Sequence, residues 1–275
     1  MKSALTSAAW IGLAISAGSV PLLAQLQDNS EKQMTCENGG HDGQNARHCE
    51  VREQTFPSVG RLSLDASPNG GMTIKGAMRS DVLVRARIES SGETEAAAAL
   101  MASQVSIDGS GGQVRAIGPE AANNAWWSVS YEIFVPQTSD LNLKSHNGGI
   151  NISDVRGQIH FDVTNGGVHL KRLAGDVSGA SVNGGIQVDL AGAIWDGRQL
   201  EVSTRNGGVT VAMPSYYSAH IQAETESGGI QSDFPMPLDG NKRPRRLDTN
   251  LGSGGGLIHV ATVNGSVRLK HAESQ

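Results

Sequence analysis

Two cysteines and two histidines near the N-terminus are the residues best spaced for chemistry. Cys36 and Cys49 bracket the phrase CENGGHDGQNARHC, and His41 and His48 lie between them. In an oxidising compartment, two cysteines this close most simply form one disulfide. It would close a loop of about 14 residues and stabilise the fold by roughly 3 kcal/mol. A Cys2His2 metal site and free thiols are the alternatives, but the spacing fits no common zinc module. The sequence therefore favours a disulfide and no metal.

Motifs for catalysis are missing from the sequence. It contains neither Gly-x-Ser-x-Gly nor His-Glu-x-x-His, and the glycine clusters at 109–112 and 252–256 are not followed by the Lys-Ser or Lys-Thr of a phosphate loop. His160 and His169 alternate with apolar neighbours, which predicts that both face solvent from a strand. We therefore expect a protein without catalytic residues, cofactor or metal. The alternative is a carbohydrate-active enzyme on a β-helix.

Two further features could bind a partner. Trp126 and Trp127 are adjacent in a predicted strand, so one should point outward and could stack on a sugar, unless a preceding segment covers it. KRPRR (242–246) is a basic loop that is either simply solvated or binds an anionic lipid, lipopolysaccharide or polysaccharide. The net charge of −5 argues against a nucleic-acid binder.

The most regular feature is an Asn-Gly-Gly phrase that returns through the second half of the chain, followed each time by alternating apolar residues. The residues of this phrase are Asn147, Gly148, Gly149, Asn165, Gly166, Gly167, Asn183, Gly184, Gly185, Asn206, Gly207, Gly208, Gly228, Gly229, Asn264 and Gly265. Ser227 replaces the asparagine of the fifth copy. Asparagine and glycine tolerate positive φ angles, so each phrase should form a sharp structural turn before a short strand. Stacked turns would also let the asparagine amides bond from unit to unit.

The spacing of the copies, about 20 residues, indicates the architecture. A second turn falls between units, at Gly157, Gly175 and Gly197. One unit cannot bury its apolar face alone, whereas stacked units can. Hairpins are the competing interpretation, because Asn-Gly is also a hairpin signal. The steady period favours stacking, so we predict an all-β fold: a β-solenoid or single-stranded β-helix-like repeat domain with one short N-terminal helix. That helix is expected at 92–104, with Ser90 and Glu93 as a capping box.

The chain is expected to divide into three parts. Residues 1–24 have a lysine, an apolar run and then small residues, which is the layout of a secretory signal peptide. A retained membrane anchor is the alternative, but the apolar run is shorter than the roughly 20 residues that a spanning helix needs. Residues 25–55 are a polar segment with the expected disulfide, and residues 56–271 are the repeat domain. No later stretch is apolar enough to span a bilayer. We therefore expect a secreted protein of the periplasm or the cell surface, without a transmembrane anchor after signal cleavage.

The ordered series of repeats resembles a known bacterial family. The phrase YEIFVPQTSDLNLKSHNGGINI (131–152), the TNGGVHL-type units and the closing ATVNGSVRLK (261–270) are similar to the toastrack-like adhesin domain, a domain of unknown function. The resemblance covers roughly residues 56–271, departs at Ser227, and is interrupted by an insertion at 241–256. It implies an all-β repeat fold related to a β-solenoid, and it brings no agreed catalytic residues.

Together these features predict a non-enzymatic, adhesin-like interaction protein that is secreted or held in the cell envelope. Its expected partner is an unknown envelope protein or glycan, not nucleic acid. Besides the enzyme, one more alternative is an envelope scaffold that self-associates through the open ends of its repeat stack.

Overall fold

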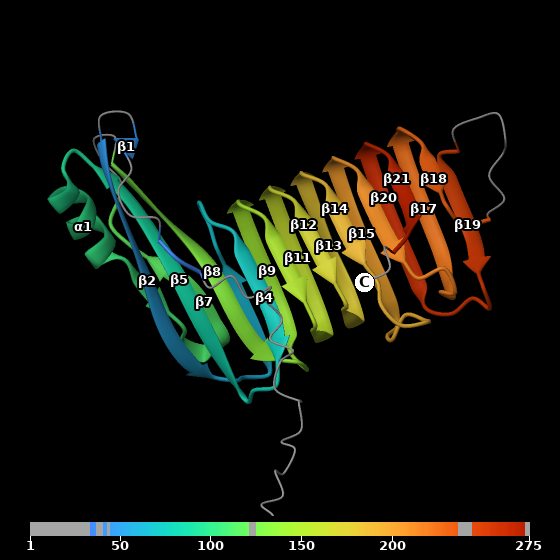
Figure 1. The fold of residues 1–275 in the computed structure, drawn as a ribbon, viewed down its shortest axis with the longest axis horizontal. Coiled ribbons are helices and arrows are strands. Elements are labelled where there is room, and N and C mark those ends of the chain that lie inside the picture. The colour runs from blue at the N-terminus through green and yellow to red at the C-terminus, as the bar shows by residue number, and fades with distance from the viewer. Residues whose placement is uncertain (1–33, 37–40, 43–44, 121–124, 236–243, 273–275) are drawn as a thin grey trace, which may run out of the picture. The chain divides into compact units, whose positions relative to one another are not determined.

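Two β-sheets that face each other make up the described chain, which comprises residues 34–36, 41–42, 45–120, 125–235 and 244–272 of the computed structural model (Figure 1). The predicted signal peptide lies outside these residues. Within them, sheet A has 11 strands and sheet B has 10. No helix in the described ranges combines the length and apolar character needed to cross a membrane.

The strands are numbered along the chain, and their order in space differs from this numbering. In spatial order, sheet A contains β1 (His41–Asp42), β2 (Asn45–Pro57), β5 (Asp81–Gly92), β8 (Trp126–Pro136), β4 (Met72–Ala77), β10 (Ile150–Ser153), β12 (Val168–Lys171), β14 (Ile186–Asp189), β16 (Val209–Met213), β21 (Val267–His271) and β18 (Ile230–Ser232). Sheet B contains β19 (Arg246–Leu251), β17 (Ala219–Ser227), β20 (Leu257–Asn264), β15 (Gln199–Asn206), β13 (Ala174–Asn183), β11 (Arg156–Asn165), β9 (Asp140–Asn147), β3 (Arg61–Asp65), β7 (Gln113–Ile117) and β6 (Ser106–Asp108). The helices are α1 (Glu95–Gln104) and the short 3-10 helix η1 (Ser110–Gly112).

Each repeat forms one coil, with a strand in sheet B, an Asn-Gly turn and a strand in sheet A. Neighbouring coils pair in parallel and in register, as β9, β11 and β13 do in sheet B and β10, β12 and β14 do in sheet A. Figure 1 shows these coils side by side. The parallel pairing confirms the predicted solenoid over the hairpin alternative.

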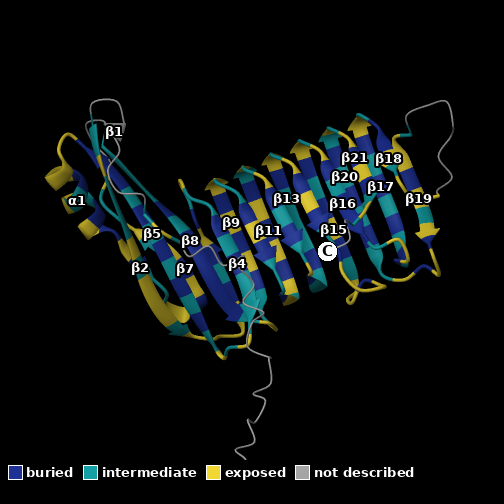
Figure 2. Cartoon of the chain, in the orientation of Figure 1, coloured by how far each residue is buried: buried dark blue, intermediate teal, exposed yellow. Residues whose placement is uncertain are grey.

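Alternation of side chains builds the core between the sheets. In β11, Ile159, Phe161 and Val163 are buried, whereas His160 and Asp162 are exposed. The same banding runs along the other coil strands in Figure 2. Full burial of such an aliphatic or aromatic side chain contributes about 1.5–3 kcal/mol before entropic costs. Stacking therefore supplies the apolar burial that a single coil lacks.

A ladder of asparagine amides ties the coils together at their turns. The Nδ2 group of Asn165 donates to Oδ1 of Asn147 at 2.9 Å. Bonds of 2.8–2.9 Å link six residues in this way: Asn69, Asn147, Asn165, Asn183, Asn206 and Asn264. The stacking expected from the sequence is thus present, and it extends back to the coil of β3 and β4.

The glycines of these turns allow the backbones of neighbouring coils to approach each other closely. The described glycines of the turns from Asn147 onward have no positive φ angle, in contrast to Gly70 (φ +154°) in the turn after Asn69 and Gly175 (φ +99°) in the second turn between coils. A Cβ atom on Gly166 would instead lie 2.3 Å from the carbonyl oxygen of Gly148, and one on Gly184 would lie 2.0 Å from that of Gly166. For the turns from Asn147 onward, the expected reason, a positive φ, is therefore wrong. Glycine is required at the first glycine position of these turns because a side chain there would collide with the neighbouring coil. The second position has more room, as at Gly167, where a Cβ would lie 3.5 Å from the Gly185 carbonyl oxygen.

A second ladder, of buried hydroxyl groups, was not foreseen from the sequence. Thr204 Oγ1 donates to the carbonyl oxygen of Gly184, and Thr262 Oγ1 donates to that of Gly207, both at 2.7 Å. Equivalent bonds are made by Ser145, Ser181 and Thr225. Each hydroxyl belongs to a residue two positions before the turn asparagine, or before Ser227, which replaces that asparagine in one copy. A Ser or Thr at this spacing is the sequence feature from which the ladder could have been predicted. Val163 interrupts the series.

The last coil of the sequence is not the last coil of the stack. Strands β20 and β21 lie between the coil of β15 and β16 and the coil of β17 and β18. The amide ladder follows this spatial order, because Asn264 bonds to Asn206 at 2.8 Å. Strand β19 then pairs antiparallel with β17 and ends sheet B. The insertion expected at 241–256 therefore supplies the terminal strand of sheet B.

The N-terminal end of sheet A continues as antiparallel strands β8, β5 and β2. Helix α1 packs on β2 and β5, and Thr94 caps its N-terminus, with its Oγ1 accepting the Ala97 N–H at 3.1 Å. Ser90 lies in β5 and donates to the Ala98 carbonyl at 2.7 Å. The helix was predicted correctly, but the Ser90–Glu93 capping box was wrong.

The disulfide joins Cys36 and Cys49, whose Cα atoms lie 5.7 Å apart. Cys49 belongs to β2, so part of the segment expected to be merely polar (25–55) is a strand of sheet A. Its alternation is hidden in the sequence because few of its side chains are apolar. Among the described residues, no group of three or more His, Cys, Asp or Glu side chains could hold a metal ion.

Candidate binding groove

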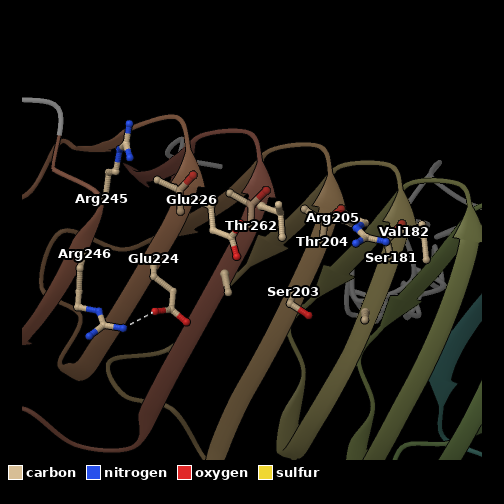
Figure 3. Close-up of a pocket in the computed structure, with 14 residues that line it drawn as sticks. Ser181, Val182, Ser203, Thr204, Arg205, Glu224, Glu226, Arg245, Arg246 and Thr262 are labelled. Atoms are coloured by element: carbon tan, nitrogen blue, oxygen red, sulfur yellow. Dashed lines mark hydrogen bonds and ion pairs between the residues drawn. The ribbon is translucent and has the colours of Figure 1, made fainter.

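Outward side chains of sheet B form rows that cross the strands, because in-register parallel pairing places equivalent positions side by side. One row is small: Ala180 on β13, Ser203 on β15 and Ala261 on β20 are successive neighbours. The rows on either side carry larger side chains. A groove with a volume of about 630 Å³ therefore remains over the small residues (Figure 3).

The wall nearer the Asn-Gly turns mixes apolar and charged groups. It consists of Val182, Arg205, Val263 and Glu226. Val182 is 41% exposed, which is unusual for an aliphatic side chain in a strand. Arg205 and Glu226 are exposed and have no side-chain hydrogen bond or ion pair within the described chain. This wall therefore offers an apolar surface and two free charges of opposite sign.

An ion pair closes one end of the groove. Arg246 Nη2 donates to Glu224 Oε2 at 3.0 Å. This hydrogen bond holds the pKa of the Glu224 carboxyl below its ordinary value, and His259 adds a smaller contribution in the same direction. Arg245, the next residue of the predicted basic loop, is exposed and projects beyond the pair (Figure 3). Positions 242 and 243 of that loop lie outside the described residues.

A polar network borders the groove on its other side. His259 Nδ1 lies 3.6 Å from Glu201 Oε1, and its Nε2 lies 3.6 Å from Glu224 Oε1. A smaller hollow of about 300 Å³ continues from Glu224 to Asp248. Two carboxylates around a histidine resemble an acid–base set, but a general acid needs a raised pKa, and that of Glu224 is lowered. Within this set, Glu224 is therefore suited to accept hydrogen bonds as a carboxylate and not to serve as the general acid.

A third hollow, of about 400 Å³, lies nearer the N-terminal coils of sheet B. Both of its arginines already have partners among the lining residues. Arg61 donates to Gln158 at 3.0 Å, and Arg198 donates to Asp176 at 2.9 Å. This hollow therefore leaves fewer groups for a ligand than the groove does.

The two histidines expected to face solvent do so, on different sheets. The His160 side chain is 51% exposed on sheet B, 3.2 Å from Asp162, and the His169 side chain is 40% exposed on sheet A, 2.6 Å from Asp189. Because the sheets separate them, they form no common site.

The adjacent tryptophans lie on β8, in the N-terminal part of sheet A. Trp127 packs against the core, and its Nε1 group donates to the Pro119 carbonyl at 2.8 Å. Trp126 lies 5.6 Å from the guanidinium of Arg47. Neither lines the groove.

The turn residues found in the sequence border the groove without lining it. Their asparagines stand one position beyond the wall of Val182 and Arg205, and their amides bond to one another. The groove itself was missed by sequence reasoning. Its signal was a small residue three positions before a turn asparagine, as at Ala180, Ser203 and Ala261.

Comparison with known proteins gives a family and several distant structures. The family model Toastrack DUF4097 matches residues 84–270. No curated protein matches the chain. A "putative cell adhesion protein" from Clostridium sporogenes is 12% identical, with 81% of this chain and 100% of that chain covered and a TM-score of 0.39. A "putative lipid binding protein" from Parabacteroides distasonis is 10% identical, with 82% and 97% covered and a TM-score of 0.39. A "putative adhesin" from Bacteroides fragilis is 8% identical, with 81% and 97% covered and a TM-score of 0.29. None of these descriptions names an enzyme.

Proposed function

The chain belongs to the Toastrack DUF4097 family, and we propose that it is a non-enzymatic, adhesin-like binding protein of the cell envelope or the cell exterior. The observation that carries the proposal is the groove over Ala180, Ser203 and Ala261. Its floor belongs to in-register strands of one sheet, so the site is formed before any ligand arrives. Sites on strands are also held more rigidly than sites on loops.

The dimensions of the groove suit an extended partner. It crosses β13, β15, β20 and β17, which at ordinary strand spacing span about 14 Å. An envelope protein segment or a glycan chain can lie along such a path. The groove's free charges and exposed Val182 then provide polar and apolar contacts to the same partner.

Two observations support the proposed location outside the cytoplasm. Residues 1–24 have the composition of a secretory signal peptide. The disulfide between Cys36 and Cys49 suits an oxidising compartment. Both favour a place outside the cytoplasm, where envelope partners are available.

Retention by cell-envelope fragments tests the proposal. Ala261→Trp fills the floor of the groove with a large side chain, and the purified variant should co-sediment with the fragments at least about tenfold more weakly than the wild type. Asn151→Trp, at an exposed position on the outer face of sheet A, is the matched control and should sediment like the wild type. Equal retention of both variants, with thermal melts showing both folded, would count against the groove.

A carbohydrate-active enzyme is the second candidate, because Glu201 and Glu224 flank His259 on one face. The lowered pKa of Glu224 makes it a poor general acid. Turnover measured across a panel of glycans and esters distinguishes the two candidates. Any turnover that is lost in Glu224→Gln would replace the non-enzymatic proposal.

A further inference from the structure

Two guanidinium groups of the groove are open to a ligand. Arg205 and Arg245 are exposed, and neither side chain makes an ion pair or hydrogen bond within the described chain. The unpaired charges that line the groove are Arg205, Arg245 and Glu226, so they sum to +1 (two positive, one negative), whereas the whole chain has a net charge of −5. A ligand with anionic groups would complement them.

The two arginines are far apart along the groove. Arg205 lies on β15, whereas the Arg245 carbonyl accepts the N–H of Thr225, on β17, at 2.9 Å. Strand β20 lies between β15 and β17, so about three strand spacings, or roughly 14 Å, separate the two backbones. In Figure 3 the Arg205 and Arg245 side chains lie at opposite ends of the groove and do not point toward each other, so a chain with repeated anionic groups suits them better than a single small anion.

Between the arginines, the groove offers hydrogen-bonding groups that suit hydroxyls. The Ser203 hydroxyl and the Glu226 carboxylate are not hydrogen-bonded within the described chain. Thr204 and Thr262, in contrast, use their hydroxyls on glycine carbonyls. A carboxylate only accepts hydrogen bonds, so Glu226 needs donors such as sugar hydroxyls.

The backbone of the groove argues against a peptide ligand. Strands β13, β15 and β20 are interior strands that pair with neighbours on both sides. An extended peptide could not add to them as a further strand, which is the usual source of its affinity. No aromatic ring is among the described residues that line the groove, so stacking on a neutral sugar is unavailable as well.

We propose that the groove binds a linear acidic polysaccharide with carboxylates on successive sugars, such as a polyuronate. This inference rests on the proposed function and names the ligand class of the same groove. The ligand's carboxylates pair with Arg205 and Arg245, its hydroxyls meet Ser203 and Glu226, and its rings lie over the alanine floor.

Calorimetric titration of the purified protein with an oligogalacturonate long enough to span the groove tests the inference. A neutral oligosaccharide of the same length should bind at least about tenfold more weakly, and added salt should weaken oligogalacturonate binding. Arg205→Gln and Arg245→Gln should each lower the affinity on the order of tenfold, because each removes a charge-assisted contact. Arg268→Gln, at an exposed arginine on the outer face of sheet A, is the control and should leave the affinity unchanged.

Absence of oligogalacturonate binding, or binding that both groove variants retain in full, would overturn the inference. Tighter binding of poly-L-glutamate with the same arginine dependence would overturn it too, and would assign the groove to an acidic peptide. In each case Ala261→Trp can still lose retention by envelope fragments. Failure of the polyuronate is therefore distinguishable from failure of the proposed function.

Discussion

At Gly184 the missing side chain lets two coils meet backbone to backbone. A Cβ atom there would lie 2.0 Å from the carbonyl oxygen of Gly166, well inside contact distance. The next glycine is less constrained, because a Cβ on Gly185 would lie 3.3 Å from the Gly208 carbonyl oxygen. The sequence showed that glycine is needed at these turns. It could not show why, because the reason lies in a neighbouring coil.

This difference predicts a graded series of stabilities. Gly184→Ala should lower the free energy of unfolding on the order of 3 kcal/mol, because the backbones must separate. Gly185→Ala should cost about 1 kcal/mol, because the neighbouring coil has only to yield slightly. Urea denaturation measures both.

Gly60→Ala is the control for this series, since no atom lies within 4 Å of a Cβ placed there. Its stability should match that of the wild type. If Gly184→Ala and Gly185→Ala lost no more stability than Gly60→Ala, close approach of the backbones would not be the reason for glycine at these turns.

At the scale of the element, the coils were predictable and their order was not. Every coil alternates apolar and polar residues in the same way, so β17 and β20 could each follow β15 without changing the core. One signal was present: Ser227 lacks the amide of the other turns and belongs to the last coil of the stack, beyond which only antiparallel β19 follows in sheet B. The amide ladder can end at Ser227 because no further coil follows with an asparagine that needs a partner.

Engineered disulfides test the strand order. Ser203 and Ala261 are direct neighbours on β15 and β20, so the Ser203→Cys/Ala261→Cys pair should oxidise readily at a Cα separation of about 5 Å. Ser203 and Glu224 lie two strands apart, roughly 9–10 Å, so the pair Ser203→Cys/Glu224→Cys should stay reduced. Mass spectrometry of the oxidised proteins reads the result. The reverse pattern would mean that coils stack in sequence order.

At the scale of the whole molecule, the candidate site depends on the returning C-terminal coil. Ala180 and Ser203 come from consecutive coils, whereas Ala261 lies far along the sequence and joins their floor only because β20 inserts beside β15. Repeat period and alternation predicted the parallel stack. They could not predict the groove, because Ala261 joins its floor from a strand that is not next in sequence. They also could not predict the antiparallel strand β2, because its side chains are mostly polar and show no apolar alternation.

Photo-crosslinking from the groove floor tests the central claim most directly. A diazirine amino acid of about the size of leucine, small enough to leave the groove open, is placed at Ser203, or at Asn151 on the outer face of sheet A, and each protein is irradiated with the same cell-envelope fragments. If the groove holds the partner, covalent adducts form from position 203 and are several times rarer from position 151. Equal yields from the two positions, or a higher yield from position 151, would contradict the assignment of the binding site to the groove of sheet B.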